Sequence, residues 1–405
     1  MVTQLGKVWL AHHRFSNVLI SLIISGVIMT SAEGREQHWV GLTYALCGFL
    51  SFFAVCNLKC RVLSSSAFVV FALIFIGNVF SHFFSEPISW LKVLHPLFWG
   101  FVAAALAGIF SCRPSIAVCT AWLLLIAPAA LFVFNSCSDV QFGIEQASDF
   151  RGGQRFMGFS SEPAHLAQSI AIAWGCLMYC ESIRIGSWIA GFAIGVVLLV
   201  ASKSLTAVPL ILLGCFLALY VSWAAKRRLQ SAIFLLVLLL GCVWMIAGSD
   251  FAIKDRIMQL SRNVVDGSSS DQSAFSRIGA TLDCFWDWVQ GNPWVPAGTP
   301  KVDELGASYS PSGNMHFGPL VIAVACGVPG LLIFLWMCVA GISADWKIGV
   351  CLVAAFMLSG RVVTPEGAVV LGLLQSLGWR TYISRRSSEF AGLQRIYISE
   401  NMTCP

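Results

Sequence analysis

Long apolar stretches separated by short polar segments dominate the chain. A helix that crosses a bilayer needs about 20 mostly apolar residues, and about twelve stretches approach that length. Because backbone groups inside lipid must satisfy one another, we expect these stretches to be helices. The predicted spans are residues 16–31, 38–56, 66–83, 90–110, 115–135, 163–181, 186–202, 205–225, 231–248, 316–341, 346–360 and 363–379. The pattern therefore predicts an all-α polytopic integral membrane protein, with residues 1–405 as a single membrane domain.

Two polar segments are much longer than the others and form the predicted loops 136–162 and 249–315. Within the second loop, apolar residues recur at helical spacing over residues 274–290. Since tryptophans favour the membrane–water interface, we predict a helix that lies along the membrane surface. Asn292 and Pro293 end this helix, and Gly298 is expected in the following turn.

Basic residues orient the spans, because short cytoplasmic loops are enriched in Lys and Arg. Lys226, Arg227 and Arg228 form the densest basic cluster beside a span, so we place this cluster in the cytoplasm. Alternation of the spans then puts both termini in the cytoplasm and both long loops on the opposite side of the membrane. An even number of spans satisfies nearly every loop.

The composition agrees with a membrane protein and excludes several other classes. Apolar residues make up 57% of the chain and charged residues only 11%, whereas soluble domains carry about 25% charged residues. A soluble globular domain, a disordered chain, a nucleic-acid-binding module and a small disulfide scaffold are therefore excluded. The net charge of +5 identifies no partner until the charges are assigned to sides of the membrane.

Most of the 15 cysteines lie within apolar stretches, where cysteine behaves as a small apolar residue. The sequence holds neither a CxxC pair nor a Cys/His cluster, so we predict no metal site. A disulfide between Cys137 and Cys284, in the two long loops, is left open.

The first long loop carries residue types that bind anions. Arg151 and Arg155 flank a pair of glycines, and an arginine offers a planar fork to phosphate oxygens while glycine lets the backbone approach. Glu162 comes directly before Pro163, which is expected to start a span, and Glu162 lies one helical turn from His165. The alternative is a solvated loop followed by an ordinary helix start.

Four further polar residues lie on the external side of the predicted topology. Lys203 lies in a short turn, Arg361 lies in another, and Arg277 lies in the first turn of the surface helix, where a cation does not complement the helix dipole. His316 lies where the second loop enters the membrane, and a histidine there can serve as a general base. The alternatives are a polar turn for Lys203 and a histidine bonded to the backbone for His316.

From about Arg151 to Leu335, the chain resembles the bacterial O-antigen polymerase and O-antigen ligase superfamily of integral membrane glycosyltransferases. The resemblance is carried by motifs in a fixed order. These are Arg155 with Glu162-Pro163, then Ser202-Lys203-Ser204, then Arg277 with Asn292-Pro293 and Gly298, and finally His316 with Gly327 and Gly330.

The resemblance implies a substrate in which undecaprenyl pyrophosphate carries an oligosaccharide at the periplasmic face of the bacterial inner membrane. It implies that the reaction needs no metal and no cofactor, and that the bilayer and a chain-length regulator are candidate partners, with no nucleic acid. Arginines would stabilise the departing pyrophosphate. The implied catalytic residues are His316, Glu162 and Arg277, and the implied substrate-binding residues are Arg151, Arg155, Lys203, Arg361 and His165.

Three functions compete. The first is a polysaccharide repeat-unit polymerase for O-antigen, capsule or exopolysaccharide, and the Glu162-Pro163 pattern favours it. The second is an O-antigen ligase that moves finished polymer to lipid A-core. The ligase pattern has a small polar residue after the histidine, whereas this chain has Phe317. The third is a transporter of lipid-linked oligosaccharide, which would be expected to place cations inside the helix bundle.

Overall fold

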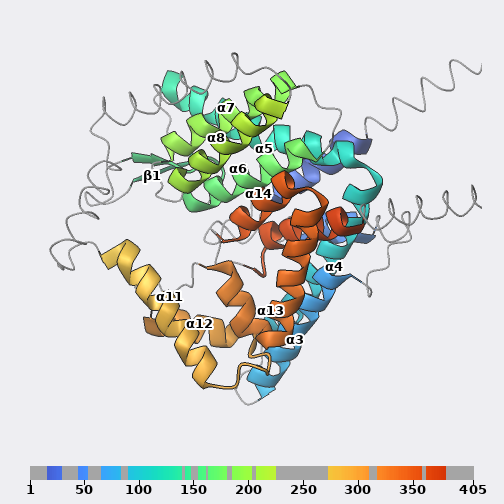
Figure 1. Ribbon diagram of the computed structural model, residues 1–405, viewed down its shortest axis with the longest axis vertical. Helices are drawn as coiled ribbons and strands as arrows, with labels where there is room; N and C mark the ends of the chain where they lie inside the picture. The colour runs from blue at the N-terminus through green and yellow to red at the C-terminus, as the bar shows by residue number, and fades with distance from the viewer. Residues whose placement is uncertain are drawn as a thin grey trace, which may run out of the picture.

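The computed structural model describes residues 16–29, 44–52, 65–83, 90–138, 142–146, 154–160, 163–179, 185–202, 207–224, 272–309, 317–357 and 362–379. Nearly all of these residues are helical, as the sequence predicted (Figure 1). The labelled helices are α3 (Ser66–Phe83), α4 (Trp90–Cys112), α5 (Pro114–Cys137), α6 (Pro163–Met178), α7 (Ile185–Ala201), α8 (Ala207–Ala224), α11 (Gln272–Gln290), α12 (Gly298–Tyr309), α13 (Gly318–Ala344) and α14 (Trp346–Met357). Three unlabelled helices span Ser16–Met29, 44–52 and 365–379.

Helix bounds lie close to those of the predicted spans. Three helices of the described residues are long and apolar enough to cross a membrane, and these are Lys92–Cys112, Pro114–Cys137 and Gly318–Ala344. Shorter apolar helices are Ser16–Met29, Ser66–His82, Gly186–Ala201, Ala207–Tyr220 and Trp346–Met357. The predicted span 231–248 lies outside the described residues. The helical membrane class is supported, and the number of twelve spans stays a prediction.

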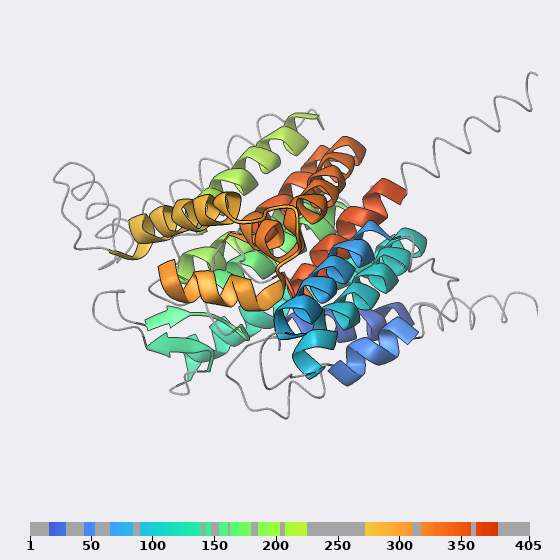
Figure 2. The same cartoon turned by 90° about the horizontal axis from the view of Figure 1, so that it is seen from below.

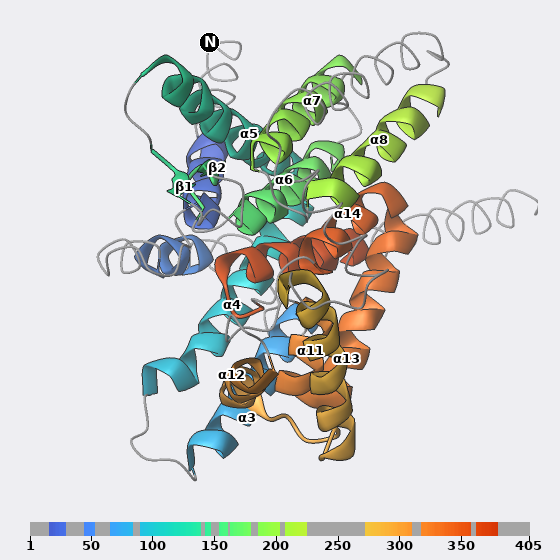
Figure 3. The same cartoon turned by 90° about the vertical axis from the view of Figure 1, so that its left-hand side faces the viewer.

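Helix α6 lies among α5, α7 and α14 (Figure 3). Its residues from Leu166 to Leu177 are all buried, which is typical of a helix that is apolar on every side. Trp174 of α6 packs on Phe192 of α7, with ring centroids 4.9 Å apart. Helix α6 is therefore held firmly by its neighbours, and its first turn gives the first long loop a rigid surface to pack on.

Two elements of the first loop were not predicted. Strands β1 (Ile144–Gln146) and β2 (Gln154–Phe156) form an antiparallel hairpin, with Glu145 opposite Arg155. Figure 2 shows the two strands at the edge of the molecule. Each strand has three residues, which is too short for an alternating apolar pattern to be recognised.

The second loop also differs from the expectation. The predicted surface helix corresponds to α11, but Gly298 starts the helix α12 instead of lying in a turn. The turn was expected because glycine favours turns. Here Gly298 takes a left-handed φ of 76°, so the turn-like conformation is present at the first helical residue. Helix α12 buries Val302 and Leu305, which are three residues apart and share one side of the helix.

Helix α13 is broken at Gly327, although the sequence predicted one continuous span. Gly327 has φ 67° and ψ −176°, a conformation that is not helical. Pro329 follows two residues later and lacks the N–H group that a continuous helix needs. The helix therefore consists of two halves. Backbone N–H and carbonyl groups that lack helical partners at the break can form hydrogen bonds with the second loop.

Candidate functional site

The hairpin of the first loop is fixed to α5. Asn135 Nδ2 donates a hydrogen bond to the carbonyl oxygen of Phe142 at 2.6 Å, and the Phe142 N–H donates to Asn135 Oδ1 at 3.2 Å. On the partner strand, Phe156 pairs with Ile144 at the same open end of the hairpin, and its ring meets Phe132 edge-on, with centroids 5.3 Å apart. The last turns of α5 therefore hold both strands at the open end of the hairpin.

Arg155 is buried in the middle of β2, and only 8% of the residue is exposed. Successive side chains of a strand point to opposite faces, so Arg155 lies on the face opposite Phe156 and its α5 contact. An arginine is rarely so buried unless its guanidinium is paired. The Arg155 side chain is therefore packed inside the protein, and the alternative of a solvated loop side chain does not apply to it.

The turn after β2 lies against the start of α6. The Met157 N–H donates to the carbonyl oxygen of Gly143 at 2.8 Å, and Gly158 has a φ of 61°. A Cβ atom added at Gly158 would lie 3.5 Å from Leu166 Cδ1. Pro163 starts α6, where the missing N–H of proline has no effect. Half-buried His165 is thus in the first turn of α6, close along the chain to the hairpin.

The loop between α11 and α12 fits into the break of α13. The Val328 N–H donates to the carbonyl oxygen of Pro293 at 2.8 Å, and the Ala297 N–H donates to that of Val324 at 3.4 Å. A Cβ atom added at Gly327 would lie 3.0 Å from the carbonyl oxygens of both Pro293 and Trp294. A glycine is required at the break because a side chain would collide with this loop.

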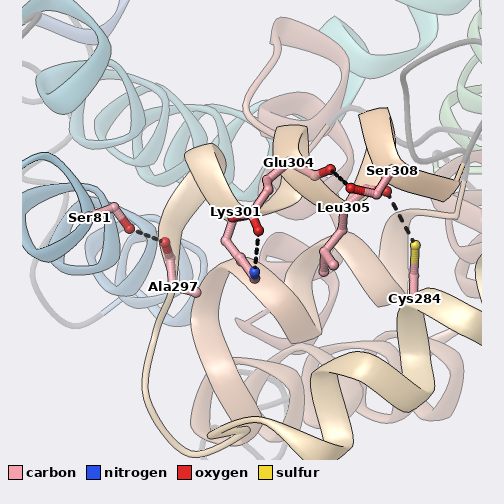
Figure 4. Close-up of polar contacts among 7 residues, drawn as sticks. All are labelled: Ser81, Cys284, Ala297, Lys301, Glu304, Leu305 and Ser308. Atoms are coloured by element: carbon pink, nitrogen blue, oxygen red, sulfur yellow. Dashed lines mark hydrogen bonds and ion pairs between the residues drawn. The ribbon is translucent and has the colours of Figure 1, made fainter. Parts of the chain in front are cut away.

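The same loop is held from the other side by α3. The fully buried Asn78 accepts a hydrogen bond from the Thr299 N–H at 2.7 Å and donates one to the Lys92 carbonyl oxygen at 3.1 Å. Ser81 Oγ donates to the Ala297 carbonyl oxygen at 2.5 Å (Figure 4). A Cβ atom added at Gly298 would lie 2.5 Å from Asn78 Oδ1. The loop therefore depends on both spans for its position.

We call this connected set of contacts the loop junction. It consists of Asn78, Ser81, residues 293–299 and Gly327. The junction brings together two motifs that are far apart in the sequence, the Asn-Pro and Gly298 motif and the Gly327 motif. Sequence analysis missed Asn78 and Ser81. The available signal was an asparagine in the middle of an otherwise apolar stretch.

Several predicted site residues lie outside the described residues. They are Arg151, Glu162, Lys203, His316 and Arg361. Arg277 lies in α11, but only its backbone is described. The predicted placement of Glu162 one helical turn from His165, and any meeting of the first-loop and second-loop residues, stay predictions.

Phe317, directly after His316, is the N-cap of α13. Its backbone is extended, with φ −125° and ψ 102°, and it makes no side-chain cap hydrogen bond. Small polar residues are favoured at this position because their side chains bond the free N–H groups of the helix start. A small polar residue at this position, as in the ligase pattern, would be suited to cap α13. Phe317 cannot form such a cap and packs against the apolar core instead.

The two loop cysteines are separate thiols. Cys137 is the exposed last residue of α5, whereas Cys284 is buried on α11 and its Sγ donates to the Leu305 carbonyl oxygen of α12 at 3.7 Å (Figure 4). The disulfide that the sequence left open is not formed. Burial, together with the nearby carboxylates of Asp287 and Asp283, raises the pKa of Cys284 above that of a free thiol. In the described part of the chain, no three Cys, His, Asp or Glu side chains gather as a metal site.

A comparison with protein families finds one match. Residues 188–335 match the family model described as O-antigen ligase. No curated protein and no solved structure matches the chain. The matched segment runs from α7 into the second half of α13 and includes residues 293–299 and Gly327 of the loop junction. Over this segment the chain is therefore similar to the O-antigen ligase family, which confirms its resemblance to the O-antigen polymerase and ligase superfamily.

Proposed function

We propose that this protein is a polysaccharide repeat-unit polymerase. It transfers a growing glycan from undecaprenyl pyrophosphate to a lipid-linked repeat unit at the periplasmic face of the inner membrane, with both termini in the cytoplasm. The main support is the family match over residues 188–335, which indicates a glycosyltransferase-like enzyme acting on lipid-linked sugars. The apolar helices are consistent with a membrane location.

The proposed reaction breaks the bond between the anomeric carbon of the donor glycan and a pyrophosphate oxygen. The pyrophosphate keeps the electron pair, and the acceptor hydroxyl oxygen forms the new bond to the anomeric carbon. The hydroxyl proton passes to a base, for which His316 is our first candidate and Glu162 our second. Arginine side chains lower the barrier by stabilising the negative charge that develops on the leaving group.

Arg155 and Arg277 are the first candidates for that stabilisation. The burial of Arg155 supports its role, since a charged hydrogen bond in a site shielded from water is stronger than one in water. Arg277 is a candidate because it belongs to α11 and lies within the segment that matches the family model. Arg151, Lys203, Arg361 and His165 are further candidates for binding the substrate.

An O-antigen ligase is the second candidate, because the matching family model carries that description. The two enzymes differ in the acceptor, which is a lipid-linked repeat unit for a polymerase and lipid A-core for a ligase. The proposed polymerase agrees with the Glu162-Pro163 pattern and with Phe317 in place of a small polar residue.

A deletion strain distinguishes the candidates by the glycans in its cell envelope. Loss of a polymerase leaves single repeat units on the final acceptor, and a gel of the envelope lipids shows this one-unit band. Loss of a ligase leaves long polymer on undecaprenyl pyrophosphate, which would contradict the proposed function. Transport of labelled lipid-linked substrate in vesicles without chain growth would contradict both and favour a transporter.

A further inference from the structure

Helix α11 has three distinct sides over its described side chains, residues 281–290. Successive helical residues are rotated by about 100°. One side carries Cys284 and Trp288, which pack against α12 and the apolar core. A second side carries the exposed carboxylates of Asp283 and Asp287. The third side is apolar and is not covered by any described part of the chain.

We call this third side the outer stripe and define it by Leu282, Phe285, Trp286 and Val289. All four side chains are exposed, Leu282 and Trp286 by more than half. They fall within a sector of about 100° around the helix. The sequence alone grouped Trp286 with Trp288, whereas the structure separates them, because Trp288 points to the protein and Trp286 points away.

We infer that the outer stripe of α11 inserts into the outer leaflet at the boundary between lipid headgroups and acyl chains, so that α11 lies in the membrane surface. The four side chains sink between the lipid headgroups, while Asp283 and Asp287 face water. This placement is typical of an amphipathic helix with aromatic residues on its apolar side. It would hold the second loop at the depth of the lipid phosphates.

Exposed apolar side chains are also present on the loop after α11 and on α13. Trp294 and Val295 follow α11 and are also exposed, and the Trp294 backbone adjoins Gly327 of the candidate span α13. Helix α11 contacts α13 directly. The outward residues of α13 are Leu332, Leu335, Trp336 and Val339.

A lipid surface fits these exposed apolar side chains better than a protein partner. Protein interfaces have an apolar centre surrounded by a polar rim. The exposed carboxylates of the described part of α11, Asp283 and Asp287, lie together on one side of the helix and do not surround the outer stripe. The outer stripe is therefore a poorer fit for a chain-length regulator or a second copy of the chain than for lipid.

Photo-cross-linking in the full-length protein tests this placement. The photoreactive residue p-benzoylphenylalanine replaces Phe285 or Trp286 in the outer stripe, and replaces Asp287 or Trp288 as matched controls on the other two sides. Each variant is purified, shown to elute as one species, and placed in nanodiscs of phosphatidylethanolamine and phosphatidylglycerol. After irradiation, mass spectrometry of the α11 peptide detects the mass of an added phospholipid.

We expect phospholipid adducts at positions 285 and 286 and none at positions 287 and 288. Lipid adducts equally frequent at position 287, or absent at both 285 and 286, would overturn the placement. A cross-link from 285 and 286 to another protein or to a second copy would also overturn it. The result is independent of the proposed reaction, because a transporter or a ligase with α11 in the membrane surface would give the same adducts.

Discussion

Gly327 holds a backbone conformation that is almost exclusive to glycine, with φ 67° and ψ −176°. We predict that Gly327→Ala destabilises the protein by about 1–3 kcal/mol, the usual cost of such strain, with added collision against Pro293 and Trp294. The matched control is Gly186→Ala, because a Cβ atom there meets nothing within 4 Å. Thermal unfolding in detergent should show a lower Tm for the first variant only. Equal Tm values would contradict the break in α13.

Arg155 and Arg277 carry the proposed stabilisation of the leaving pyrophosphate. Removing one donor that stabilises a developing negative charge lowers a rate by about 10²–10³-fold. We therefore expect Arg155→Ala and Arg277→Ala to abolish long polymer in an envelope gel while single repeat units stay on the acceptor. Lys301→Ala is the control, because Lys301 is an exposed cation paired with Glu304 on α12 (Figure 4).

The amount of each variant in the membrane fraction must match that of the unaltered protein, so that lost polymer reflects lost activity. Normal long chains in both arginine variants would exclude these residues from the donor site.

At this scale, the sequence identified residue types but not their surroundings. Arg155 was selected for its glycine-rich neighbourhood, and its burial became visible only with the hairpin and its contacts to α5. Gly327 and Gly298 were selected from the family motifs. Their physical role is the close approach of backbone to backbone at the loop junction. For Gly298 this depends on contacts with α3, more than 200 positions away in the sequence.

Among the elements, α3 and the loop before α12 are joined mainly through Asn78. We predict that Asn78→Ala lowers the free energy of unfolding by about 1–3 kcal/mol, because the Thr299 N–H and the Lys92 carbonyl lose their buried partner. Asn135→Ala is a suitable comparison, since Asn135 also fixes a loop but is only half-buried. Thermal unfolding of both variants should show the larger loss for Asn78. A loss no larger than that of Asn135→Ala would contradict the loop junction.

The packing of α11 on α12 makes a prediction for thiol chemistry. Only the thiolate reacts with alkylating agents, and burial raises the pKa of Cys284. A raised pKa means a smaller thiolate fraction at any given pH, so near neutral pH iodoacetamide should label Cys284 more slowly than the exposed Cys137. Labelling of Cys284 should increase as the pH is raised.

Peptide mass spectrometry after timed labelling measures both sites in one sample. Unfolding the protein in denaturant is the control, and it should remove most of the difference in rate. Faster labelling of Cys284 than of Cys137 in the folded protein would contradict the packing of α11 on α12.

Long helices were predicted well, and short or interrupted elements were not. Helices such as α3 and α5 follow from long, mostly apolar stretches. The hairpin strands and α12 are too short or too weakly patterned to stand out. The break in α13 was missed because membrane helices tolerate glycine and proline when neighbouring groups satisfy the backbone, and here Pro293 supplies that partner.

For the whole molecule, two separately anchored regions make up the proposed site. The first loop is fixed to α5 and α6, and the second is fixed between α3 and α13. Composition predicted the membrane class, because so few charged residues cannot cover a soluble surface. The proposed meeting of the two regions involves Glu162 and His316, which are outside the described part of the chain, and it stays a prediction.

Reconstitution with a single substrate tests the proposed polymerase most directly. The purified protein is mixed in lipid with undecaprenyl-pyrophosphate-linked repeat units and no other acceptor. We predict a ladder of longer glycans that all remain on undecaprenyl pyrophosphate, with the ladder lost in Arg155→Ala and Arg277→Ala and kept in Lys301→Ala. Absence of any chain longer than one repeat unit, together with transfer of finished polymer to lipid A-core when that acceptor is supplied, would contradict the polymerase and identify a ligase.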